Sequence, residues 1–199
     1  MLVKLTRNMD PFSYVCVLTS IVAGLAVTRL VGGLGQLLQT RKRTPSYWVH
    51  SVWMANMLLT VIITWWVQYR WRTTQQWTLF LVLWMLVAPI TLYLATALLF
   101  PNEQEGEPIT SWREHYFEHN RGFFLFLAST YAIDLVDTLL KGWLHFREMG
   151  PLYVGSMSMF IVLCSIAAFT KSARFHGAFA VFYLIYNSAM LSSNLLRLM

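Results

Sequence analysis

The sequence predicts an all-α, polytopic integral membrane protein, a bundle of about six transmembrane helices. Of its 199 residues 57% are hydrophobic and only 12% are charged, whereas soluble domains carry about 25% charged residues. Six apolar runs are each long enough to cross about 30 Å of hydrocarbon at 1.5 Å per residue. We therefore expect a single transmembrane domain over residues 1–199, without a separate soluble domain.

The predicted helices follow one another with short polar connectors between most of them. The first follows a basic start, as a signal peptide does, but it is too long and lacks a small-residue cleavage site, so we expect an uncleaved helix. Pro89 lies near the middle of the third run, where it frees a backbone carbonyl and favours a kink. The six runs cover residues 12–38, 47–69, 77–100, 122–142, 151–170 and 177–198.

The one long connector, residues 101–121, opens with a turn region rich in Pro, Gly and Glu and continues into an amphipathic stretch. Such a stretch is suited to lie on the membrane surface, where it is a candidate contact for a protein partner. An even number of helices places both termini on one side. Lys and Arg are divided equally between the two sides, so the positive-inside rule leaves the orientation unresolved. In a bacterium the expected location is the inner membrane.

The net charge of +6 does not indicate a nucleic-acid partner. The basic residues lie in short loops between apolar runs rather than along a soluble face. The lipid bilayer itself, and anionic lipid headgroups in particular, is the simpler partner for such loops. The sequence contains no P-loop, dinucleotide fingerprint or Gly-x-Ser-x-Gly motif, so no cofactor is expected and an enzyme is the less favoured class.

Two aspartates in the fourth predicted helix are the most unusual feature. In "YAIDLVDTLLKG", Asp134 and Asp137 are three residues apart and share one helix face. A charge at the centre of a membrane helix costs roughly 2.5–3.5 kcal/mol, so each carboxylate must be paired, hydrated or protonated. Lys141 follows Asp137 by four residues, the favourable order for an ion pair. Asp134 has no such partner in its own helix, and Arg29 of the first helix is the natural candidate.

Other helices carry polar residues at a similar predicted depth. Counting from one membrane face puts Arg29, Asn56 and Asn187 at depths of about 14–15 Å. Asp134 follows at about 18 Å. Four helices are therefore expected to bring a strong polar group to nearly one level, close to the midplane of the bilayer.

This arrangement supports two hypotheses about function. The first is a small channel or transporter, whose ion, proton or solute pathway passes Asp134 and Asp137, with Arg29 as the counter-charge and Asn56 and Asn187 lining it. In a proton-coupled version, protonation of Asp134 would release Arg29 and shift the contact between the two helices. The second is a non-transporting sensor, scaffold or complex subunit in which the same groups form a structural polar plug.

Small residues line one face of the first predicted helix. Gly24, Thr28 and Gly32 recur at a spacing of four residues, which allows the backbone of another helix to approach closely. A protein this small is expected to form a homo-oligomer, and this face is suited to a contact between chains.

The segment "HYFEH" suggests a weaker third hypothesis. His115 and His119 are four residues apart and would share a helix face, as metal ligands require. A metal-dependent membrane enzyme would need further ligands, and His145 lies on the other predicted side of the membrane. A surface segment that happens to contain histidine is the favoured interpretation.

Overall fold

The computed structural model describes residues 10–74, 76–101 and 111–196, and side chains as far as residue 192. Within these ranges the chain is helical and contains no strand, which confirms the predicted all-α bundle. The elements are α1 (Pro11–Thr40), α2 (Trp48–Val67), the 3-10 helix η1 (Gln68–Thr73), α3 (Leu79–Ala97), α4 (Trp112–Leu140), α5 (Trp143–Phe169) and α6 (Ala173–Leu196).

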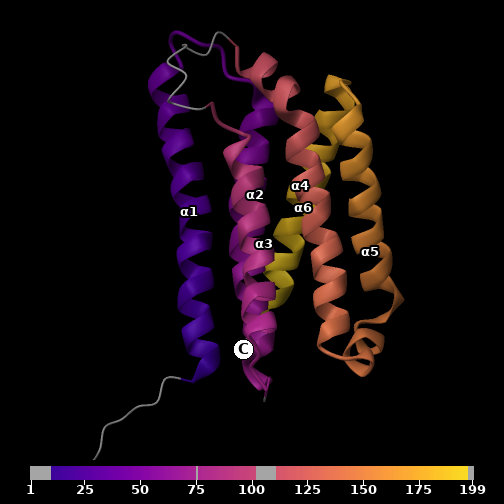
Figure 1. Cartoon of the computed structure of the whole chain (residues 1–199). Helices are drawn as coiled ribbons and strands as arrows, with labels where there is room; N and C mark the ends of the chain where they lie inside the picture. The colour runs from indigo at the N-terminus through magenta and orange to yellow at the C-terminus, as the bar shows by residue number, and fades with distance from the viewer. Residues whose placement is uncertain (1–9, 75, 102–110, 197–199) are drawn as a thin grey trace, which may run out of the picture.

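The helices are arranged in two layers (Figure 1). Neighbouring pairs give the order α1, α3, α4, α5 in one layer, while α2 and α6 pack on each other in the second. Among the described residues five helices, α1 to α5, are long and apolar enough to cross a bilayer, with η1 continuing α2. The protein is therefore an integral membrane helical bundle.

The core between the two layers is built around the indole of Trp53 in α2, which is fully buried. Its ring meets Phe123 and Phe124 of α4 with centroids 5.4 and 5.0 Å away. On α6 it meets Phe179 at 5.3 Å and Tyr183 at 5.1 Å. Most of these contacts are edge-to-face, the geometry that the quadrupoles of aromatic rings favour. This aromatic centre joins α2, α4 and α6.

Helix α4 begins earlier than the sequence predicts. The hydroxyl of Ser111 caps it by accepting a hydrogen bond from the backbone N–H of Glu114 (3.3 Å). Trp112, Tyr116 and Asn120 recur every four residues and are buried against the bundle. The prediction of a surface-lying stretch is therefore wrong for residues 112–121, which form the first turns of α4. Residues 102–110 of the same connector lie outside the described residues.

Helix α5 also begins earlier, at Trp143, and is broken at Gly150. Gly150 has φ 76° and ψ 171°, a backbone conformation that favours glycine. Pro151 then starts the longer segment, because its ring suits the first turn of a helix and lacks an N–H to be satisfied. The predicted start at residue 151 is thus the start of the second segment. In Figure 1 the short first segment lies at the lower end of the bundle.

Within the chain, helix α1 packs through a face other than the small-residue face. A Cβ added at Gly33 would clash with the ring of Phe100, which follows α3 and is buried. At Gly24 and Gly32 an added Cβ would meet nothing within 4 Å, and Thr28 is exposed. The predicted small-residue face therefore lies on the outside of the bundle, and Gly33 provides the close approach within the chain.

We predict that Gly33→Ala and Gly32→Ala, which differ by one position, have opposite effects. Gly33→Ala should lower the free energy of unfolding by about 1–3 kcal/mol, because the buried Phe100 ring must shift. Gly32→Ala should be neutral or stabilising by up to about 1 kcal/mol, since alanine is the better helix former. Unfolding in mixed detergent micelles, followed by circular dichroism, measures both. Equal destabilisation would contradict the packing of Phe100 on α1.

Candidate functional site

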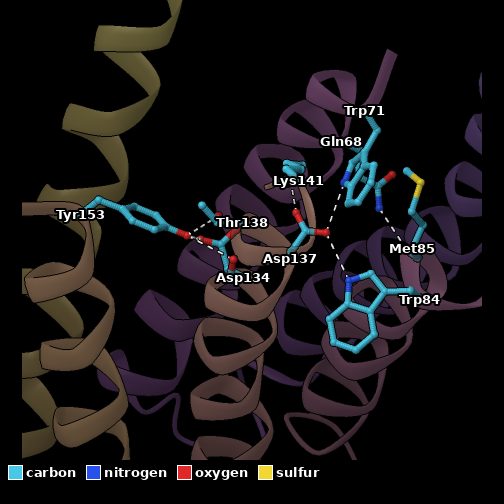
Figure 2. Close-up of polar contacts among 9 residues, drawn as sticks. All are labelled: Gln68, Trp71, Trp84, Met85, Asp134, Asp137, Thr138, Lys141 and Tyr153. Carbon is cyan, nitrogen blue, oxygen red and sulfur yellow. Dashed lines mark hydrogen bonds and ion pairs between the residues drawn. The ribbon is translucent and has the colours of Figure 1, made fainter. Parts of the chain in front are cut away.

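The carboxylate of Asp137, near the end of α4, is held by three donors (Figure 2). Its Oδ1 accepts hydrogen bonds from the indole N–H groups of Trp71 in η1 (3.1 Å) and Trp84 in α3 (3.3 Å). Its Oδ2 forms the predicted ion pair with Lys141, at 2.5 Å. The Lys141 ammonium also lies 4.9 Å from the centroid of the Trp71 ring. Asp137 thus ties α4 to η1 and α3.

The carboxylate of Asp134 points to the other side of α4, towards α5 (Figure 2). Its Oδ2 accepts a hydrogen bond of 2.6 Å from the hydroxyl of Tyr153, which also lies 3.1 Å from the Asp134 carbonyl oxygen. The buried Thr138 hydroxyl is 2.8 Å from the same phenol oxygen. Because Tyr153 gives its one proton to Asp134, Thr138 is the donor in that contact. Tyr153 follows the Gly150 break closely, so this cluster fixes the second segment of α5 to α4.

These carboxylates lie near the C-terminal end of α4. Asp134 is 22 residues from Trp112, about 33 Å along the helix, and 6 residues, about 9 Å, from Leu140. Indole donors and the Lys141 ammonium are available at this end of the bundle, as expected for the interfacial region of a membrane protein.

Arg29 and Asp134 do not form the predicted pair. The Arg29 guanidinium donates from Nη2 to the carbonyl oxygen of Pro101 (2.8 Å) and lies 5.9 Å from the centroid of the Phe100 ring. Both residues follow the end of α3, at the opposite end of the bundle from Asp134 (Figure 1). Carbonyl oxygens beyond the last turn of a helix lack intrahelical donors. Arg29 supplies one, and thereby fastens α1 to the end of α3.

The two predicted asparagines belong to a buried polar network between α2, α4 and α6. Asn56 donates from Nδ2 to a backbone carbonyl of α6 (2.9 Å), and Asn187 donates to the hydroxyl of Thr60 (3.2 Å). Thr60 lies 3.1 Å from the Tyr183 hydroxyl, which accepts a 2.6 Å hydrogen bond from Tyr131. The structure therefore brings Asn56 and Asn187 into one network. Tyr131 lies one turn before Asp134 on α4.

Thr60 and Tyr183 of this network, and Tyr153 at Asp134, are site residues that the sequence analysis missed. A signal for the first two was present, because Thr60 is four residues after Asn56 and Tyr183 four before Asn187. Polar residues at this spacing share a helix face. Tyr153 had no comparable signal, since it is the single phenol near the start of an otherwise apolar run.

His115 and His119 lie together on α4, with ring centroids 4.5 Å apart. His119 donates from Nδ1 to the carbonyl oxygen of His115 (3.1 Å). In the described part of the chain no group of three or more His, Cys, Asp or Glu side chains is placed to hold a metal ion. The two histidines therefore have no third ligand of these types there, and the metal-dependent enzyme stays a prediction.

The carboxylates are partly buried: the side chain of Asp137 is 18% exposed, and Asp134 is also of intermediate exposure. Two hollows among the described residues are lined by residues of α1, α2, η1 and α3, and neither Asp134 nor Asp137 lines them. No family model, curated protein or solved structure matches this chain. What the cluster can do must therefore follow from its own geometry, which is that of a clamp between helices.

We predict that Trp84→Phe destabilises the protein and that Trp143→Phe does not. Trp84→Phe keeps an aromatic ring but removes one donor to Asp137, which should cost about 1–3 kcal/mol of unfolding free energy. Trp143 is 66% exposed on the first segment of α5, so its replacement should change stability by less than about 0.5 kcal/mol. Unfolding in mixed micelles compares the two variants. Similar unfolding free energies for the two variants would show that the Trp84 indole does not hold Asp137.

Proposed function

We propose that this chain is a non-transporting membrane subunit or scaffold that assembles laterally in the bilayer through the outer face of α1. One observation carries the proposal: both carboxylates of α4 are engaged by side chains of the same protein, from η1, α3 and α5. In a bacterium such a subunit belongs in the inner membrane.

The geometry of the carboxylates supports a structural role. An ion or proton pathway needs a carboxylate with a face open to water and a second state to move into. Asp137 already accepts from two indoles and an ammonium, and Asp134 from a phenol. Releasing either one would break contacts between helices and leave a poorly solvated charge, which is costly. Clamping helices is the role that these contacts suit best.

The outer face of α1 supports lateral assembly. Gly24 and Gly32 leave open space where another backbone can approach. The hydroxyl of Thr28, between them, donates to the carbonyl oxygen of Gly24 (2.8 Å), so it exposes no unsatisfied donor to lipid. A second copy of this chain is the simplest partner, because a symmetric dimer uses the same face twice.

Transport through Asp134 remains the second candidate, and one observation favours it. The hydroxyls of Tyr131, Tyr183 and Thr60 form a connected chain inside the bundle, starting one turn from Asp134. Chains of hydroxyl groups can relay protons. In that version Asp134 and Asp137 would pass protons to this row of hydroxyl groups from their end of α4. Asn56 and Asn187 would line the pathway.

Flux in proteoliposomes tests the proposal against this second candidate. Vesicles holding the wild-type protein should pass protons and potassium no faster than protein-free vesicles, because the carboxylates are engaged. Asp134→Asn, which keeps the shape of the side chain, should lower stability without changing the flux. Flux in the wild type that disappears in a folded Asp134→Asn variant would overturn the proposal and establish the transport pathway.

We predict that the double variant Gly24→Leu/Gly32→Leu loses self-association while keeping its fold. The added side chains have open space in the single chain but block the approach of a second helix. Gly155→Leu on α5, also in open space, is the matched control and should leave association unchanged. Cross-linking in lipid nanodiscs or vesicles measures the oligomer. Equal association in all three proteins would show that α1 is not the interface.

A further inference from the structure

A hollow of about 140 Å³ opens on the outer surface between the start of α1 and the end of α2. Three aromatic side chains at its rim are exposed: Trp65 by 47%, Trp66 by 41% and Tyr69 by 52%. Its lining is mostly apolar and consists of Phe12, Cys16, Trp65, Trp66, Gln68 and Tyr69.

The walls of the hollow are held in place by contacts within the chain. The Trp65 indole donates to the hydroxyl of Ser20 on α1 (2.9 Å). The Tyr69 ring packs on Phe12 and stacks with Trp66, with centroids 6.2 and 6.4 Å away. The hollow is therefore built by the fold, as a preformed binding site is.

Its position corresponds to the membrane interface. Phe12 is the second residue of α1, and Trp65 and Trp66 end α2, so the hollow lies at one end of two spanning helices. Trp and Tyr concentrate at the level where lipid headgroups meet acyl chains. An occupant would have its polar part among the headgroups and its apolar part against the hollow.

The cationic side chain of Arg72 lies beside the hollow, at the same end of the helices. Arg72 of η1 donates from Nη1 to the Tyr69 hydroxyl (2.5 Å), and its guanidinium lies 4.4 Å from the centroid of that ring. Arg72 is exposed and forms no ion pair with any described residue. A guanidinium carries five N–H donors in a planar fork, which matches the oxygens of a phosphate.

We propose that this hollow binds an acyl chain of one anionic phospholipid, whose phosphate is held by Arg72. The acyl chain packs against the apolar lining. The indoles and the phenol at the rim lie at the level of the ester groups, and the guanidinium donates hydrogen bonds to the phosphate. This site is separate from the carboxylate cluster and from the small-residue face of α1. The lipid site is therefore independent of the proposed assembly, and each can be tested without the other.

Native mass spectrometry of protein extracted from vesicles of equal parts phosphatidylglycerol and phosphatidylcholine tests the site. The wild type should retain one phosphatidylglycerol with a preference of about fivefold or more over phosphatidylcholine. Both lipids carry a phosphate, but the choline ammonium of phosphatidylcholine repels the Arg72 guanidinium and weakens its contact with that phosphate. Arg72→Gln should bring the two lipids close to parity. The control Arg147→Gln, at another exposed arginine on the same side, should keep the preference. Parity in the wild type, or the same loss in both variants, would overturn the proposal.

The thiol of Cys16 locates the lipid, because it lines the hollow while Cys164 is fully buried. A membrane-soluble maleimide should modify Cys16 several-fold more slowly in phosphatidylglycerol vesicles than in phosphatidylcholine vesicles. In the Arg72→Gln variant this protection should disappear. Equal rates in the two lipids, or full protection without any anionic lipid, would show that phospholipid does not occupy the hollow and would overturn the assignment.

Discussion

A carboxylate at the end of a membrane helix is only partly hydrated, so the two aspartates of α4 take donors from the protein, and these contacts organise the bundle. Asp137 accepts hydrogen bonds from side chains of η1 and α3 and from Lys141, and Asp134 accepts one from a side chain of α5. Helix α4 becomes the common partner of the helices on both sides of it. Without these contacts α3 and α5 would meet α4 mainly through apolar side chains, which lipid tails replace at little cost.

Other polar groups of the bundle also have hydrogen-bond partners within the protein, at different levels along the helices. At the opposite end Arg29 satisfies a carbonyl beyond α3 and so fixes α1, whose close approach depends on Gly33 and Phe100. In the middle, Asn56 and Asn187 join α2 to α6 through hydrogen bonds rather than through charges. The charged groups thus meet their partners at the ends of α3 and α4, where pairing and hydration cost least, and neutral polar groups occupy the interior.

The sequence predicted the features that depend on local spacing. The lengths of the apolar runs predicted the helices, and the four-residue spacing predicted the Lys141–Asp137 ion pair, which the structure contains. The Arg29–Asp134 pair was wrong because the two depths were not counted from one level. Gly33 of α1 faces Phe100 and Gly122 of α4 faces Leu98, so both lie at the end of α3. From that level Arg29 is about 6 Å and Asp134 about 18 Å along its helix. Tyr153 was missed because its partner lies in a different helix. Tyr153 lies three residues after the break at Gly150, at the start of the second segment of α5.

Two double-mutant cycles, measured together by unfolding in mixed micelles, test the central claim that the α4 carboxylates are clamps between helices. One cycle combines Asp134→Asn with Tyr153→Phe, and the other combines Asp134→Asn with Arg29→Gln. The clamp predicts a coupling free energy of about 1 kcal/mol or more between Asp134 and Tyr153. It also predicts additivity, within about 0.5 kcal/mol, for the distant Arg29. Coupling to Arg29 with additivity at Tyr153 would contradict the account.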